Sequence, residues 1–216
     1  MKLDRSTLES FRGRTLPDLL ADPTRLLFVG VNPGLRAAAV QAHFGGGGTN
    51  RFFPALYRAG VVDRLIDASA GFRPEDLAHL RERGVGITSL VAGASARADE
   101  LTAAQLVAGA QDLAARVRRI APVAVAMLGI TAYRTAFATP AATLGRQPDP
   151  LGAGVAVWVV PNPSGLNRHS TLADLAAAYR EVAVAAGIRP FVVPEDVAGR
   201  DRTTAAVPRG RGTQSR

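Results

Sequence analysis

Two short polar loops hold the residues whose types and spacing could do chemistry. Residues 30–34 (GVNPG) place Asn32 directly after the apolar run 26–31, and residues 162–168 (NPSGLNR) follow the apolar run 155–160. An asparagine amide can orient a water molecule or donate to a developing anion, but it cannot act as a strong base. Turn formation by Asn, Pro and Gly is the alternative explanation of both loops.

Other familiar catalytic patterns are absent from the sequence. It has no G-x-x-x-x-G-K-[ST] loop, no H-E-x-x-H pair and no G-x-S-x-G elbow. It has no cysteine, which excludes disulfides, thiolate-bound zinc and cysteine-held iron–sulfur clusters. Lys2 is the one lysine, so a lysine Schiff base would have to form at the chain terminus. We therefore expect no metal and no cofactor.

The apolar patterns predict the elements that must position the two loops. Strands are expected at residues 26–31, 85–91, 122–129 and 155–160. Helices are expected at residues 50–59, 75–83, 103–120, 131–138 and 172–186, with Thr102 and either Ser170 or Thr171 as caps. This alternation predicts a three-layer α/β fold, with a short, mostly parallel four-stranded sheet and helices on both faces. The carboxyl ends of parallel strands meet at one edge, so both loops are expected on the same rim.

Length and composition indicate one globular domain with short extensions. We expect a lead-in at residues 1–24, the domain at 25–190, and a basic, disordered tail at 191–216. No apolar run is long enough to span a bilayer and the start lacks a signal-peptide core, so a cytoplasmic protein without a membrane partner is expected. The net charge of +8 favours polyanionic partners, although solubility alone would explain it.

The two loops together resemble the mismatch-specific uracil/thymine DNA glycosylase family, within the wider uracil-DNA glycosylase superfamily. That family has G-[I/V]-N-P-G after its first strand and N-P-S-G-L-x-R after its last. Between them lie an aromatic residue and N-R-F-[WF], which match Phe44 and residues 50–53 (NRFF) here. The similarity extends from about residue 26 to residue 187, although the stretch 45–49 is about one residue longer than the family pattern.

The resemblance implies base flipping and hydrolysis of an N-glycosidic bond without a lyase step. Asn32 matches the asparagine that positions the attacking water. Phe44 matches the aromatic residue on which the flipped base stacks, with a buried core phenylalanine as the alternative. Backbone N–H groups near Val31 and Phe44 would bond the pyrimidine edge. Ala37 would leave room for the methyl group of thymine.

The second loop matches the family's wedge. Leu166, with Gly165, would fill the gap left in the base stack, and Arg168 would contact the orphaned base or a phosphate. Asn162 and Ser164 would lie near the flipped nucleotide's sugar or phosphates. An ordinary turn after a strand is the alternative.

Several other residues have expected roles, some of them with an alternative. Asp99 would assist catalysis as a carboxylate or remain a solvated residue before a helix. Asn50, with Arg51, would cap a helix or support the site. His43 and His169 are expected as polar residues at the rim, and Trp158 as a core residue.

The resemblance implies a monofunctional DNA glycosylase for uracil, and for thymine or other damaged bases, in double-stranded DNA with G·U or G·T mismatches. It would act as a monomer in base excision repair, in the cytoplasm at the nucleoid. A non-catalytic mismatch-binding module is one alternative. A small-nucleotide-binding α/β protein is another, but it would need the phosphate loop or carboxylate pair that the sequence lacks.

Overall fold

The computed structural model describes residues 4–193, so nearly all of the predicted tail, 191–216, lies outside it. One sheet forms the centre, and its strands are ordered β2-β1-β3-β5-β4. Their bounds are β1 Leu26–Gly30, β2 Val85–Ser89, β3 Ala124–Leu128, β4 Gly145–Gln147 and β5 Ala156–Val160. All neighbours pair in parallel except β4, which runs antiparallel to β5. The predicted α/β fold is confirmed, with one more strand than expected.

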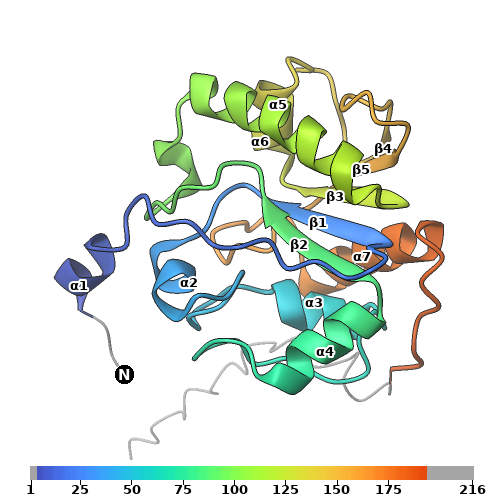
Figure 1. The fold of residues 1–216 in the computed structure, drawn as a ribbon, viewed down its shortest axis with the longest axis horizontal. Helices are drawn as coiled ribbons and strands as arrows, with labels where there is room; N and C mark the ends of the chain where they lie inside the picture. The colour runs from blue at the N-terminus through green and yellow to red at the C-terminus, as the bar shows by residue number, and fades with distance from the viewer. Residues whose placement is uncertain (1–3, 194–216) are drawn as a thin grey trace, which may run out of the picture.

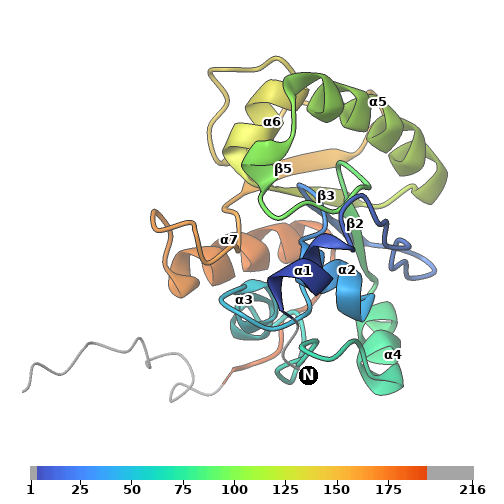
Figure 2. The ribbon, with the colours of Figure 1, turned by 90° about the vertical axis from the view of Figure 1, so that its left-hand side faces the viewer.

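Helices cover both faces of the sheet (Figures 1 and 2). Helices α5 and α6 lie on one face, and α3, α4 and α7 lie on the other. Their bounds are α3 Phe52–Arg58, α4 Pro74–Glu82, α5 Ala103–Ile120, α6 Ile130–Ala136 and α7 Leu172–Ala185.

Each central strand is apolar on both faces, because successive side chains point to opposite sides. On β1, Leu26 and Phe28 enter the core under α3 and α7, whereas Leu27 and Val29 enter the core under α5. Trp158 on β5 is buried at 6% exposure, in the same core as Phe28, as its sequence context predicts. Two cores separated by one sheet hold the carboxyl ends of the strands in fixed register.

The two long helices begin at side-chain caps. Thr102 Oγ1 accepts from the Gln105 N–H at the start of α5, and the Gln105 side chain accepts from the Thr102 N–H. Thr171 and Asp174 form the same reciprocal pair at the start of α7, so Thr171, not Ser170, is the cap. Each cap satisfies backbone donors that the helix itself leaves free.

The sequence patterns miss two elements, α2 (Leu35–Val40) and β4. Helix α2 has six residues, and its N-cap Gly34 supplies no side-chain bond, so it shows neither a long apolar period nor a cap signal. It forms because Leu35, Ala37 and Ala38 are buried by the surrounding chain. Strand β4 is three residues long and is stabilised by pairing with β5.

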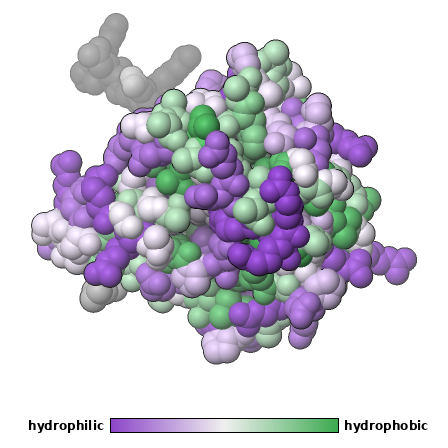
Figure 3. Space-filling model, turned by 45° about the horizontal axis from the view of Figure 1, so that its top comes forward, coloured by the Kyte–Doolittle hydropathy of each residue, from purple (hydrophilic) through white to green (hydrophobic). Residues whose placement is uncertain are grey.

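The remaining elements, α1 (Arg5–Glu9) and a 3₁₀ turn at Ala98–Glu100, lie beyond the sheet. Segments of the lead-in pack on the domain, since Leu19 forms an antiparallel bridge with Ile87 of β2. On the face seen in Figure 3, hydrophilic and hydrophobic residues are intermixed. Within residues 4–193, no helix combines the length and the apolar character that crossing a bilayer requires.

Candidate active site

A cleft of about 1280 Å³ opens at the carboxyl edge of the sheet. The last residues of three strands line it: Gly30 of β1, Ser89 of β2 and Leu128 of β3. Pro161, directly after β5, lines it as well. Ligand sites of open α/β sheets form at this edge, where loops from several strands converge.

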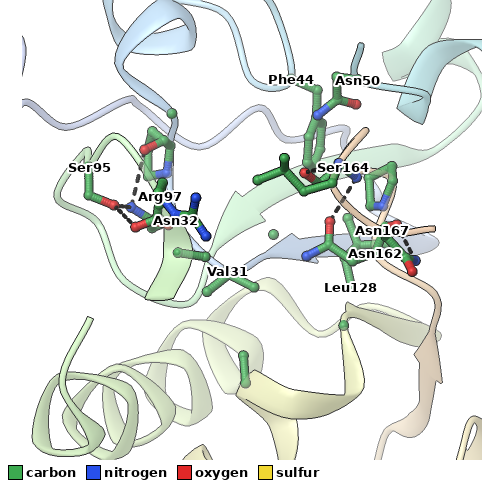
Figure 4. Close-up of a pocket in the computed structure, with 18 of the residues that line it drawn as sticks. Val31, Asn32, Phe44, Asn50, Ser95, Arg97, Leu128, Asn162, Ser164 and Asn167 are labelled. Atoms are coloured by element: carbon green, nitrogen blue, oxygen red, sulfur yellow. Dashed lines mark hydrogen bonds between the residues drawn. The ribbon is translucent and has the colours of Figure 1, made fainter. Parts of the chain in front are cut away.

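Both predicted loops line this one cleft. Asn32 belongs to the segment after β1, and Leu166 belongs to residues 162–168, which we name the β5 loop. In Figure 4, Asn32 and Ser95 lie on one side of the pocket, and Asn162, Ser164 and Asn167 lie on the other. The alternation of strands and helices thus brings together two segments that are far apart in the chain.

The side-chain amide of Asn32 is held by its nitrogen. Nδ2 donates to the backbone oxygens of Pro33 and Gly93, each at 3.2 Å, and to Ser95 Oγ at 2.8 Å. Two carbonyl acceptors fix which end of the amide is nitrogen, because an amide oxygen cannot donate to them. Its donors are therefore engaged, and Oδ1 is left as an acceptor for a ligand such as water.

Ser95 belongs to a segment that sequence motifs did not single out. Its hydroxyl donates its hydrogen to the Arg97 backbone oxygen at 2.7 Å. The Ser95 oxygen therefore acts as the acceptor for the Asn32 amide N–H. The Ser95 N–H also donates to Pro33 O at 3.1 Å, which ties the segments after β1 and β2 together. The serine is buried at 6% exposure. Only this tertiary pairing reveals it, since the surrounding residues, AGASARA, carry no recognisable pattern.

Replacing Ser95 by alanine is expected to lower the rate of the chemical step about five- to tenfold. The amide of Asn32 would lose one of its three acceptors, and one orienting hydrogen bond contributes about 1 kcal/mol. Single-turnover rates measure the effect, with affinity for the substrate measured separately. Ser95→Thr keeps the hydroxyl and should retain most of the rate. Full activity of Ser95→Ala would show that Asn32 needs no such support.

Phe44 forms an aromatic wall of the cleft. Its ring stacks on Phe52 of α3, with centroids 4.0 Å apart and planes inclined by 22°. Phe52 is in turn held edge-on by Phe28 of β1, with centroids 5.2 Å apart. A Cβ built on Gly30 would come within 3.2 Å of the Phe44 ring, so the glycine allows the ring to lie against the strand. Phe44 is half-buried and supported from behind by the core.

The β5 loop is shaped by its own polar side chains. Asn162 Oδ1 accepts from the Ser164 N–H at 2.9 Å, and Asn167 Nδ2 donates to Asn162 O at 2.9 Å. Ser164 Oγ accepts from the Leu166 N–H at 3.3 Å. These bonds turn the polar groups inward and leave the Leu166 side chain 71% exposed at the cleft. An exposed leucine held on an internally bonded loop is suited to contact an apolar surface of a partner.

The other predicted base-binding residues also line the cleft. Val31 is half-buried, and Ala37 on α2 is buried at 5% exposure. Asn50 lines it too, and its Oδ1 accepts from the Phe52 N–H at the first residue of α3, although the N-cap of this helix is Arg51 and not Asn50. Arg168 lies elsewhere, in a smaller adjoining hollow of about 550 Å³.

Two titratable residues near the loops, Asp99 and His43, differ in their exposure to solvent. Asp99 is exposed and ion-paired with Arg97 at 2.6 Å, and this hydrogen-bonded partner lowers the pKa of the carboxyl group. His43 lines the cleft, but it is buried and not a solvated rim residue, with Nε2 2.9 Å from Pro17 O. Burial lowers the pKa of His43, because the charged imidazolium would lose its hydration.

The acidic residues of the cleft are engaged by arginines. Among residues 4–193, the carboxylates that line it are Glu9 and Asp99, which pair with Arg12 and Arg97. The same part of the chain holds no group of three His, Asp or Glu side chains placed to bind a metal ion. Apart from the arginines Arg5 and Arg36 and the histidines His43 and His169, the other polar groups that line the cleft are neutral amides, hydroxyls and backbone groups, which orient a reactant better than they move its protons.

A comparison with protein-family models finds a match for this chain. The model described as the uracil DNA glycosylase superfamily matches residues 17–183. The matched region starts before β1, includes both loops of the cleft, and ends within α7.

Proposed function

Since this chain belongs to the uracil-DNA glycosylase superfamily, whose members are DNA glycosylases, we propose that it removes uracil from G·U pairs in duplex DNA by hydrolysis. The observation that carries this proposal is the shared cleft: Asn32 and Leu166 line one cavity together with the aromatic wall formed by Phe44. A nucleotide turned out of a duplex needs such a cavity, together with an apolar group to fill its place in the stack.

The reaction breaks the bond between the sugar C1′ and the base nitrogen. Charge develops as a cation on the sugar and an anion on the departing uracil. We propose that Asn32 Oδ1 accepts a hydrogen bond from the attacking water and holds it against C1′. The ion pair of Asp99 with Arg97 supports this assignment, because it lowers the pKa of that carboxyl group and so makes it a weaker base. Bond cleavage then runs ahead of attack by water.

The flipped base is proposed to stack on Phe44. The ring is already fixed by Phe52, so little conformational freedom is lost when a base packs on it. Backbone N–H groups of Val31 and Phe44 are proposed to donate to the uracil carbonyls, where negative charge collects. The small side chain of Ala37 supports acceptance of a 5-methyl group, and so of thymine in G·T pairs.

The direct test incubates the protein, in EDTA, with duplexes that hold a single G·U, G·T, A·U or hypoxanthine pair. Alkali then cleaves the DNA at any abasic site. We expect product at G·U, a weaker product at G·T, and no strand break before alkali. Product that requires Mg²⁺, or nicking without alkali, would contradict monofunctional hydrolysis. Tight binding to G·U duplex without any product would instead indicate a mismatch-binding module.

A further inference from the structure

The β5 loop is held to the rest of the molecule by one arginine. Arg51 Nη1 donates to Ser170 O at 2.6 Å, and Nη2 donates to Asn167 O at 2.8 Å and to Ser164 O at 3.3 Å. These backbone oxygens lie on both sides of Leu166 in the chain. The planar guanidinium, with its fixed fork of donors, therefore holds the base of the loop that presents Leu166.

The same arginine is joined to the aromatic wall of the cleft. Arg51 is the residue directly before α3, and the next residue, Phe52, stacks on Phe44. The Arg51 N–H donates to Pro163 O at 2.9 Å, so the main chain also connects the start of α3 to the β5 loop. The start of α3 is thus a common support for the Phe44 ring and for Leu166.

A close backbone contact adds to this connection. A Cβ built on Gly165 would collide with the Thr49 hydroxyl and lie 2.8 Å from Thr49 O. Glycine at position 165 therefore allows the loop to lie against the residues that precede α3. This contact limits how closely the β5 loop can approach Thr49, and the Arg51 hydrogen bonds hold the loop at that distance.

The guanidinium of Arg51 makes no ion pair with a carboxylate in the part of the chain that the structure describes. Backbone oxygens alone accept its hydrogen bonds. A neutral replacement would leave no carboxylate unpaired, so its main local effect would be to release the loop. The position can therefore be tested by substitution without creating a buried unpaired charge.

We propose that Arg51 is a positioning residue that sets Leu166 at a fixed distance from the Phe44 wall. The proposal rests on the proposed function, because it matters for activity only if Leu166 enters the DNA stack as Phe44 receives the flipped base. Arg51 does not touch the substrate in this scheme. It acts through Leu166, and its contribution should disappear when Leu166 has been truncated.

A double-mutant cycle tests this dependence. Arg51→Met is expected to lower excision from G·U duplex about tenfold and excision from single-stranded uracil DNA less than about threefold. In a Leu166→Ala background, the same substitution should cost duplex activity less than about threefold. Arg51→Lys, which keeps the charge but lacks the fork, should fall between Arg51→Met and the wild type. Equal losses on both DNA forms, or losses that multiply fully in the double mutant, would overturn the proposal.

Arg83 provides a matched control. Its guanidinium also joins distant segments through backbone oxygens, donating to Val61 O at 2.8 Å and Arg189 O at 2.5 Å, but neither acceptor belongs to the β5 loop. Arg83→Met should lower thermal stability and leave the ratio of duplex to single-strand activity unchanged. If Arg83→Met changed this activity ratio as much as Arg51→Met does, the ratio would reflect a general loss of stability and not the position of Leu166. That result would overturn the proposal.

Hydrogen exchange separates this proposal from the proposed function. In the free protein, Arg51→Met should speed exchange of the amides of Leu166 and Asn167, which are bonded to Ser164, without changing exchange in β1 and β3. Unchanged exchange in the β5 loop would overturn the positioning role, whether or not the protein excises uracil. Faster exchange in a protein that excises no base would reject the glycosylase function and leave the role of Arg51 supported. If Arg51→Met does not fold, Arg51→Lys is measured in the same way.

Discussion

Replacing Asn32 by alanine is expected to reduce excision of uracil from a G·U duplex by about 100- to 1000-fold. In the proposed mechanism, Oδ1 is the group that holds the attacking water, and removal of one preorganised polar group from an active site typically has an effect of this size. Affinity for the duplex should change little, because Leu166 and Phe44 remain. Single-turnover kinetics with enzyme in excess, together with binding to a duplex that carries an uncleavable uridine analogue, measure the two quantities separately.

Asn32→Asp is the sharper variant, because it keeps the size of the side chain and introduces a base. The Asn32 nitrogen donates to the backbone oxygens of Pro33 and Gly93, and a carboxylate oxygen in its place would be repelled by both. This repulsion should raise the pKa of the introduced carboxyl group and disturb its orientation. We expect lower activity than the wild type at pH 8, with part of it recovered on acidification, when the protonated carboxyl can donate again. Activity equal to or above that of the wild type at pH 8 would contradict the orienting role of the amide.

Truncating Leu166 to alanine is expected to lower excision from G·U duplex about ten- to thirtyfold. Burying a leucine side chain contributes about 1.5–3 kcal/mol, and alanine would lose most of it, because its methyl group cannot fill the gap in the base stack. Excision from single-stranded DNA should change much less, since no stacked gap is left to fill. Rates on the two substrates, measured with the same protein preparation, give the comparison.

The fold itself should tolerate the Leu166 change. The side chain is 71% exposed, so its removal leaves no cavity in the core. Leu65, which is 54% exposed and does not line the cleft, is the matched control. Leu65→Ala should affect neither substrate. Equal losses on duplex and single-stranded DNA for Leu166→Ala would argue that Leu166 supports the pocket and does not enter the stack.

The sequence by itself determined the layered architecture and the location of the candidate site. Apolar runs bounded by turns marked the four parallel strands, and the Thr102–Gln105 pair marked the start of α5, because these signals depend only on neighbouring residues. The convergence of the two polar loops followed from the parallel topology. The short elements α2 and β4 were missed, since burial and pairing with β5 stabilise them more than local propensity does.

Only the tertiary structure decided how the site is held. Ser95 supports the Asn32 amide, Arg51 holds the β5 loop, and His43 is buried against Pro17 O. Each of these contacts joins a side chain to a segment distant in the chain, and most of the partners are backbone oxygens. Every residue has a backbone oxygen, so no residue type or spacing marks the acceptor. Such contacts are fixed only when packing of the two cores has brought the segments together.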